Sequence, residues 1–523
     1  MLADVLGAYL ETLTEREFDA PLMAILRSSG FRDIHFLHGS FEFGKDFIAK
    51  RSGSDKITQY SIQSKAGDIS LGDWRQVRVQ IDEMRTNNLA HPNFDTALPR
   101  RTVFLTTDRL IGGAPLSAQE YSSHLEHVGE ENFEVWDRDT IIEMIGLDPE
   151  LGLAGVLADP LLRLVGEISA NEVSLPILEN YSRSWLEPGA ATPWHAAIVA
   201  AVLTNRLRRG RRLDLACLTS LLLLRAATWH AHGSEDSAGL DELIDVAGRM
   251  FAEYAEELWI LSGQEALEPD KVLGDRTELA NWVVYPVRSL RIAEILSLLA
   301  LRARREAPKS AEQIEEYVTE FVRCQPGVAH PISDNWAVSL LPVGLVLGNR
   351  DMDLFESWVT EVGRWVADYY DDGEGLAALD ASPEVEIEYL VGGPLEHVVL
   401  QPRNSSLVAA ALLDLVSVFE RGDLFDILRN EFLAVNASPE VIEVPDTKDQ
   451  YVRDGSSVTR EPNAAYDDLW SPDCAWKSAG HHRRSPESYR LARLGREWEH
   501  IALAAVVRDR WFCSTLRSYA TES

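Results

Sequence analysis

The sequence predicts an α/β domain at the N-terminus followed by a much larger all-α region. Two observations lead to this fold class. Short runs of β-forming residues, bounded by turn residues and by helical patterns, occur within the first 150 residues. Beyond Leu151, strand-like alternation disappears and long helical patterns follow one another. A chain of 523 residues is expected to form more than one domain, so we predict one domain over 1–150 and a helical region over 151–523.

The N-terminal elements follow from local patterns. Residues 1–29 have apolar side chains near helical spacing, with a capping box from Thr14 to Glu17, and Gly30 ends the helix. A strand over 31–37 and a hairpin whose arms cover 39–50 and 60–67 come next. The remaining expectations are a helix over 73–84, strands over 101–107 and 134–136, and a closing helix over 139–145. Together they predict a mixed sheet flanked by helices.

The rest of the chain reads as about ten helices that resemble a helical array, although no fixed-period repeat is found. The predicted helices cover 194–208, 213–230, 240–261, 287–304, 311–324, 335–347, 352–369, 406–419, 424–435 and 497–519. A long irregular segment rich in Pro, Asp and Ser, over about 436–490, interrupts them. This region offers no chemistry of its own, so we expect it to sense a signal, bind a protein partner or form a homo-oligomer.

The predicted hairpin carries three residues that together suggest a metal site. Gln63 and Lys65 share one face of the second arm because side chains alternate along a strand. Asp46 lies near the start of the first arm, where it can face this pair. A carboxylate, an amide oxygen and an ammonium held together form a site for a hard cation with a lysine beside it.

The segment 39–45 also fits the first seven positions of a phosphate-binding loop. That loop requires Ser or Thr after its lysine, small residues that expose backbone N–H groups, and a following helix. Here Asp46 follows Lys45, and Phe41 and Phe43 fill the loop. We therefore exclude nucleotide binding at this segment.

The order of Asp46, then Gln63-Ser64-Lys65, after an acidic helix resembles the PD-(D/E)XK nucleases, and within them the Mrr-like restriction endonucleases. The resemblance covers the first 150 residues or so. It implies a restriction-endonuclease-like fold, with Asp46 and the Gln63 oxygen holding Mg²⁺, or Mn²⁺ as the alternative ion. Lys65 would position the attacking water and stabilise the transition state. Gln in place of a carboxylate is a variant that this branch contains.

In this family an acidic residue on the first helix faces the metal. The pattern of an aromatic and an acidic residue ahead of paired aliphatics selects Asp19 as a further catalytic and metal-binding residue. Glu15 lies one turn earlier on the same face, and Glu17 is explained by its capping role. The choice among these three acids stays open from the sequence.

Three arginines on the helix over 73–84 and just after it, Arg75, Arg78 and Arg85, could form a basic face for a nucleic-acid backbone. Ordinary solvated arginines explain them equally well. The net charge of −33 excludes a protein that coats nucleic acid by bulk attraction, so contact with DNA should be confined to such local patches.

Apolar runs are too short for a membrane span, no secretory signal is seen, and the four cysteines form no Cys-x-x-Cys pair. We expect a cytoplasmic enzyme that interacts with no membrane: a Mg²⁺-dependent endonuclease that hydrolyses DNA, with a role in bacterial defence against foreign DNA implied by the resemblance alone. The alternatives are a non-catalytic nucleic-acid-binding or scaffold protein, and a nuclease subunit that acts only with a separate NTPase. The sequence does not decide between DNA and RNA, nor identify a target or an activating signal.

Overall fold

The fold is described from a computed structural model of the chain. It describes residues 6–7, 9–11, 13–37, 45–52, 56–89, 91–129, 133–146, 159–189, 192–232, 238–268, 279–372, 375–377, 386, 404–439, 442–443, 459–460, 498–499 and 501–503. The chain divides into two compact units, Met1–Gly210 and Arg211–Ser523. The expected domain boundary near residue 150 and most of the irregular segment over 436–490 lie outside the described residues.

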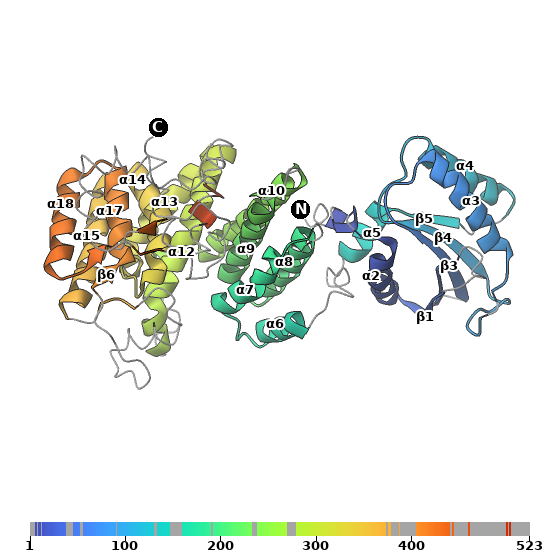
Figure 1. The fold of residues 1–523 in the computed structure, drawn as a ribbon, viewed down its shortest axis with the longest axis horizontal. Helices are drawn as coiled ribbons and strands as arrows, with labels where there is room; N and C mark the ends of the chain where they lie inside the picture. The colour runs from blue at the N-terminus through green and yellow to red at the C-terminus, as the bar shows by residue number, and fades with distance from the viewer. Residues whose placement is uncertain are drawn as a thin grey trace. The chain divides into compact units, whose positions relative to one another are not determined.

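A five-stranded mixed sheet forms the centre of the first unit (Figure 1). Its strands are β1 (Phe31–Phe36), β2 (Phe47–Ser52), β3 (Ile57–Lys65), β4 (Arg100–Thr106) and β5 (Phe133–Trp136), in this spatial order. The pairs β1–β2 and β2–β3 are antiparallel, whereas β3–β4 and β4–β5 are parallel. The predicted hairpin is therefore β2–β3, and the expectation of a mixed sheet is confirmed.

Four helices flank the sheet: α2 (Glu15–Ser28), α3 (Leu71–Thr86), α4 (Ala114–His127) and α5 (Arg138–Gly146). α3 and α4 cover one face, and α2 and α5 lie on the other (Figure 1). Trp74 of α3 packs edge-on against Phe104 of β4, with ring centroids 5.8 Å apart, and Tyr121 of α4 joins the same core. On the other face, Phe31 contacts Tyr60 and Trp136 edge-on.

Helix α4 was not predicted from the sequence. Its buried positions are Ala114, Ala118, Tyr121 and Leu125, which have helical spacing. Two of the four are alanines, so the apolar periodicity is weak, and the preceding Gly112 and Gly113 indicate a turn. The helical periodicity of this segment can be recognised only if Ala is counted as an apolar residue.

Three more helices are described in the first unit: α6 (Asp159–Ser169), α7 (Leu175–Ser182) and α8 (Thr192–Arg209). A short 3₁₀ helix over Arg183–Leu186 follows α7. Of these elements only α8 was predicted, because its buried residues form a long apolar run. α6 and α7 are short, with 11 and 8 residues.

The second unit is largely helical, as expected. Its helices are α9 (Leu213–His232), α10 (Ala238–Ser262), α12 (Leu279–Glu306), α13 (Pro308–Cys324), α14 (Ala337–Arg350), α15 (Met352–Asp371), α17 (Leu407–Val418) and α18 (Gly422–Ala434). Short 3₁₀ helices cover Glu265–Leu267, Pro326–Ala329 and Asp334–Trp336. The strand pairs β6 (Ser405–Ser406) with β7 (Ser438–Pro439), and β8 (Ile442–Glu443) with β9 (Thr459–Arg460), are two residues long.

Apolar side chains fill the interior of this unit. α17 is almost wholly buried, from Leu407 to Ser417. Asp334, itself buried, accepts hydrogen bonds at Oδ1 from the backbone N–H groups of Leu407 and Val408, at 2.9 and 3.1 Å, and so caps the start of that buried helix. In the part of the chain that the structure describes, every helix is too short or too polar to cross a lipid bilayer.

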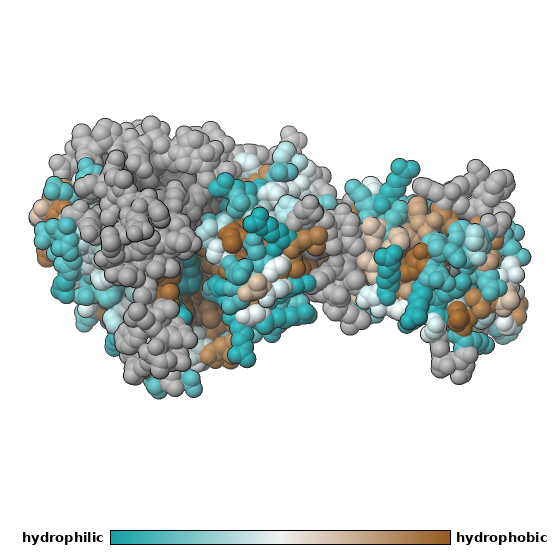
Figure 2. All heavy atoms as spheres, turned by 90° about the horizontal axis from the view of Figure 1, so that it is seen from below, coloured by the Kyte–Doolittle hydropathy of each residue, from teal (hydrophilic) through white to brown (hydrophobic). Residues whose placement is uncertain are grey.

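The face of the molecule in Figure 2 is mostly hydrophilic over the residues drawn in colour, with separate apolar patches among them. Isolated apolar residues of this kind are normal on soluble proteins.

Candidate active site

The antiparallel hairpin brings Asp46 to the end of β3. Asp46 directly precedes β2, and its backbone N–H donates to the carbonyl of Ile62 at 2.9 Å. Its own carbonyl accepts from the N–H of Leu37 at 2.8 Å. Backbone hydrogen bonds to both neighbouring strands therefore fix Asp46 at the edge of the sheet where β3 ends.

The carboxylate of Asp46 is held by two donors from β3. Its Oδ2 accepts from the backbone N–H of Ser64 at 2.7 Å and from Gln63 Nε2 at 3.0 Å. Because a carboxylate only accepts hydrogen bonds, the Gln63 amide must turn its NH₂ group toward it. The structure thus brings together two of the predicted site residues, Asp46 and Gln63, in direct contact.

The Gln63 oxygen is left without a partner by this orientation. Gln63 is 3% exposed, and its Oε1 is buried with no hydrogen bond. An unsatisfied buried acceptor costs about 1–3 kcal/mol, so its presence needs an explanation. An amide oxygen beside a carboxylate is a donor set that suits Mg²⁺, which takes oxygen ligands and retains several waters.

The described residues contain no group of three or more His, Cys, Asp or Glu side chains placed to hold a metal ion. A metal at Asp46 and Gln63 would therefore rely on one carboxylate, the amide oxygen, backbone carbonyls and water. The residues present fit Mg²⁺ or Mn²⁺ on this donor set, with weaker attraction than a site with two carboxylates.

Lys65, the last residue of β3, points to the first helix. Its Nζ lies 3.3 Å from Oε2 of Glu15, the first residue of α2, and the two side chains are 31% and 45% exposed. Among the three acids considered from the sequence, Glu15 is the one that makes this ion pair. Asp19 lies one turn further along and is half-buried.

Glu17 has the capping role that the sequence predicted. Its Oε2 accepts from the backbone N–H of Thr14 at 2.9 Å and from the Thr14 hydroxyl at 2.8 Å. These hydrogen bonds lower the pKa of the Glu17 carboxyl. The capping box sets where α2 starts, and so it places Glu15 in the first turn beside the end of β3.

A buried lysine, which the sequence did not reveal as special, precedes Asp46. Lys45 is 0% exposed, and its Nζ donates to the carbonyl of Asn87 at 3.1 Å, the residue that caps the C-terminus of α3. It also lies 5.8 Å from the centre of the Phe94 ring. Burial lowers its pKa to about 8, with a smaller contribution from Arg100 and an opposing one from Glu83.

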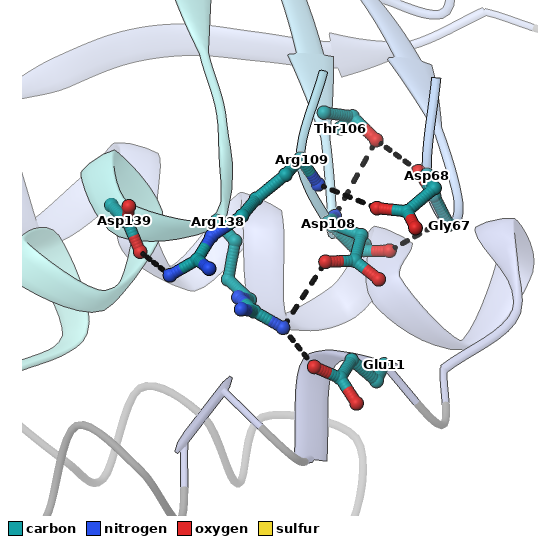
Figure 3. Close-up of polar contacts among 9 residues, drawn as sticks. Glu11, Gly67, Asp68, Thr106, Asp108, Arg109, Arg138 and Asp139 are labelled. Atoms are coloured by element: carbon teal, nitrogen blue, oxygen red, sulfur yellow. Dashed lines mark hydrogen bonds and ion pairs between the residues drawn. The ribbon is translucent and has the colours of Figure 1, made fainter. Parts of the chain in front are cut away.

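A polar network lies just beyond the ends of β3 and β4 (Figure 3). The Thr106 hydroxyl donates to the Gly67 carbonyl at 2.6 Å, and the backbone N–H of Arg109 donates to Asp68 Oδ1 at 3.3 Å. Burial and the neighbouring Asp68 raise the pKa of Asp108. Since the carboxyl ends of adjacent parallel strands meet at one sheet edge, the sequence could have suggested that Asp68 and Asp108 lie close together.

Arg138, the first residue of α5, connects this network to the N-terminal segment. Its Nη1 lies 3.1 Å from Asp108 Oδ1 and also pairs with Glu11, four residues before Glu15 (Figure 3). The Arg138 side chain is 13% exposed. Arg138 therefore holds the segment that precedes α2 in place relative to the residues that follow β4.

The three arginines proposed as a basic face have different environments. Arg85 donates to the Tyr121 hydroxyl at 3.1 Å, and Arg78 lies over the Tyr121 ring, 5.0 Å from its centre. Both therefore help to hold α3 against α4. Arg75 and Arg78 are exposed, whereas Arg85 is half-buried. Of the two exposed arginines, Arg78 lies against the Tyr121 ring, so Arg75 is the better placed to meet a ligand in solution.

Comparisons with known proteins do not place the chain in a family. No protein-family model matches it, and neither a curated protein nor a solved structure is significantly similar to it.

Proposed function

We propose that the protein is a metal-dependent endonuclease of the PD-(D/E)XK type, whose first unit has a restriction-endonuclease-like fold and hydrolyses phosphodiester bonds of DNA. The observation that carries this proposal is the contact between Gln63 and Asp46, which leaves a buried amide oxygen unsatisfied beside a fixed carboxylate. A bound Mg²⁺ or Mn²⁺ would give this oxygen a partner.

Each residue has a distinct role in the proposed reaction. Asp46 and the Gln63 oxygen hold Mg²⁺ or Mn²⁺, which when bound polarises the scissile phosphate and lowers the pKa of a water molecule. Lys65 positions the attacking water and stabilises the negative charge that develops on the phosphate. Glu15 holds the Lys65 ammonium at the end of β3 until substrate arrives, and Asp19 supports the metal through water.

The wider role follows from the same family resemblance. A cytoplasmic enzyme of this type acts in defence against foreign DNA. The acidic, largely helical second unit is assigned to regulation, through a protein partner or a second copy of the chain. Arg75 contributes to binding the DNA backbone, because it is exposed on the helix that follows the hairpin.

A second candidate function is a non-catalytic nucleic-acid-binding module. Two observations favour it: the described site has a single carboxylate at its centre, Asp46, and the Lys65 ammonium is already paired with Glu15. A related candidate is a nuclease subunit that requires a separate NTPase. Both predict that the isolated protein does not cleave.

The test is a cleavage assay with the full chain on supercoiled plasmid, linear duplex, single-stranded DNA and RNA, in Mg²⁺, in Mn²⁺ and in EDTA. The proposal expects metal-dependent nicking that Asp46→Asn abolishes. Lys50→Ala is the matched control. Lys50 of β2 forms an ion pair with Asp33 of β1, at 3.1 Å, which is comparable to the pair between Lys65 and Glu15. Retained DNA binding without cleavage by the wild-type protein would favour the binding module.

A further inference from the structure

We propose that Arg138 is a positioning residue of the candidate active site, which acts on the Lys65 ammonium through the N-terminal segment that leads into α2. This inference rests on the proposed function, because it gives Arg138 a part in the same reaction. Arg138 is assigned no contact with the metal or the substrate. It acts by holding the segment that carries Glu11 at a fixed place relative to the sheet.

Arg138 is attached to the residues after β4 by its backbone and by its side chain. Its backbone N–H donates to the Asp108 carbonyl at 3.0 Å, and its Nη1 lies 3.1 Å from Asp108 Oδ1 (Figure 3). The two side chains are 13% and 17% exposed. Partly buried charges are screened by salt much less than exposed ones, so Asp108 gives the guanidinium a firm attachment to the sheet.

The same guanidinium holds the N-terminal segment. Arg138 Nη1 also pairs with the Glu11 carboxylate (Figure 3). The aliphatic stem of Arg138 lies against this segment as well, because a Cβ atom built at Gly7 would lie 3.8 Å from Arg138 Cδ. Tyr9 and Leu10, on the same segment, are buried. Arg138 therefore holds the segment both by charge and by packing.

The constraint reaches Lys65 through a short stretch of chain. Glu11 and Glu15 are four residues apart, and four residues span at most about 14 Å. Glu15, the first residue of α2, has its Oε2 3.3 Å from Lys65 Nζ. The Lys65 side chain is 31% exposed, so packing alone does not fix its ammonium. A displacement of Glu11 therefore displaces the carboxylate that holds the ammonium in place.

A purely structural role for Arg138 would depend on Asp108 rather than on Glu11. Of the two carboxylates that Arg138 meets, Asp108 is the more buried, since the Glu11 side chain is 49% exposed. Loss of an ion pair with an exposed carboxylate costs little stability. Glu11→Gln therefore removes the connection to the segment and leaves the attachment to Asp108 intact. This variant separates positioning from folding.

The test is single-turnover cleavage of supercoiled DNA by the full chain in Mg²⁺. Glu11→Gln and Arg138→Gln should each lower the rate by about tenfold, because a small displacement of a catalytic group slows the reaction strongly. The affinity for DNA should not change. Arg109→Gln is the matched control, since Arg109 belongs to the same network but pairs with Asp139, at 3.1 Å, instead of Glu11. It should cleave at the wild-type rate, and a wild-type rate in Glu11→Gln would overturn the proposal.

A double variant tests whether the effect passes through Lys65. Adding Glu11→Gln to Lys65→Ala should cause no further loss of rate, because residues that act through one another are not additive. A second tenfold loss would overturn the proposal.

Hydrogen exchange gives a measurement that does not depend on activity. The backbone N–H groups of residues 13–18 should exchange faster in Glu11→Gln than in Arg109→Gln, because the start of α2 is held less firmly. Equal exchange in the two variants would overturn the positioning role. Faster exchange together with a wild-type protein that does not cleave would refute the proposed function, and would leave Arg138 as the residue that positions the segment.

Discussion

The Lys65 ammonium and the Glu15 carboxylate form an ion pair, 3.3 Å from Nζ to Oε2, which joins the last residue of β3 to the first residue of α2. Both side chains are partly exposed, so the pair contributes little to stability, in the range of about 0–1 kcal/mol for exposed pairs. The ion pair matters instead because it fixes the position of the Lys65 ammonium. It holds the Lys65 ammonium between the end of β3 and the first turn of α2, two residues along β3 from Gln63.

The first prediction concerns Lys65→Ala. Under the proposed mechanism this change removes an electrostatic donor from the transition state, which costs about 3–4 kcal/mol, or about 10²–10³ in rate. DNA binding and the melting temperature should change little, because the Lys65 side chain is partly exposed. Nicking of supercoiled DNA in Mg²⁺, measured beside a thermal melt, checks both parts.

Lys50→Ala is the control for this measurement, since it removes an equivalent exposed ion pair, with Asp33, away from Asp46. It should cleave at the wild-type rate. Wild-type cleavage by Lys65→Ala would contradict the mechanism, and so would an equal loss in both variants.

The second prediction separates the three acids of the first helix. Glu15→Gln should reduce cleavage by about tenfold or more, because the Lys65 ammonium loses its charged partner. Asp19→Asn should have the smaller effect, as expected for support through water. Glu17→Gln should lower the melting temperature and leave the rate of cleavage unchanged, because Glu17 caps the helix through Thr14.

A larger loss of cleavage rate in Asp19→Asn than in Glu15→Gln would show that Asp19 is the acid of the first helix that contributes more to cleavage. Comparing single-turnover rates at saturating protein removes any difference in DNA affinity among the three variants.

The hairpin was predictable because strand alternation and turn residues are local signals. Asp46 and Gln63 come into contact as the pairing of β2 with β3 requires. Glu15 could not be distinguished from Asp19, because both lie on one face of α2. Their distance from Lys65 depends on the rotation of the helix about its axis, which packing against the sheet decides.

Other features escaped prediction because they depend on tertiary structure. Nothing in the sequence around Lys45 shows that its side chain is buried against the end of α3, since Asn87 is distant along the chain. Likewise, Arg78 and Arg85 meet Tyr121, which belongs to the helix that the sequence did not predict. Contacts with this helix give Arg78 and Arg85 a packing role that the sequence did not reveal.

The third prediction uses Gln63→Glu to test for the metal. A carboxylate at this position would lie beside the Asp46 carboxylate, where the wild-type amide donates at 3.0 Å. Repulsion between like charges should lower the melting temperature in EDTA. Mg²⁺ or Mn²⁺ should raise it again by more than in the wild-type protein, because a ligand that binds only the folded state stabilises that state.

Gln59→Glu provides the matched control. Gln59 is also buried on β3, but its side chain accepts from the backbone N–H of Asp95 at 2.7 Å and is not hydrogen-bonded to Asp46. Its melting temperature should not respond to metal. If Gln63→Glu shows no larger response to metal than Gln59→Glu does, Asp46 and Gln63 do not form a cation site.

The fourth prediction concerns stability as a function of pH and the buried Lys45. Burial lowers the pKa of Lys45 to about 8 in the folded protein, from its usual value of 10.5. Between these values the unfolded chain binds a proton that the folded protein does not, so the Lys45 contribution to the free energy of unfolding increases with pH. Below about pH 8 the folded protein holds a charged lysine away from water.

Lys45→Met removes this titration and keeps most of the apolar volume, at the cost of the hydrogen bond to Asn87. The melting temperature of the wild-type protein minus that of the variant should therefore increase from pH 7 to pH 10. Lys50→Met, at a partly exposed position on β2, is the control and should give a difference that does not change with pH. A constant difference for Lys45→Met as well would mean that Lys45 keeps an ordinary pKa in the folded protein, and the lysine would then be solvated rather than buried against the end of α3.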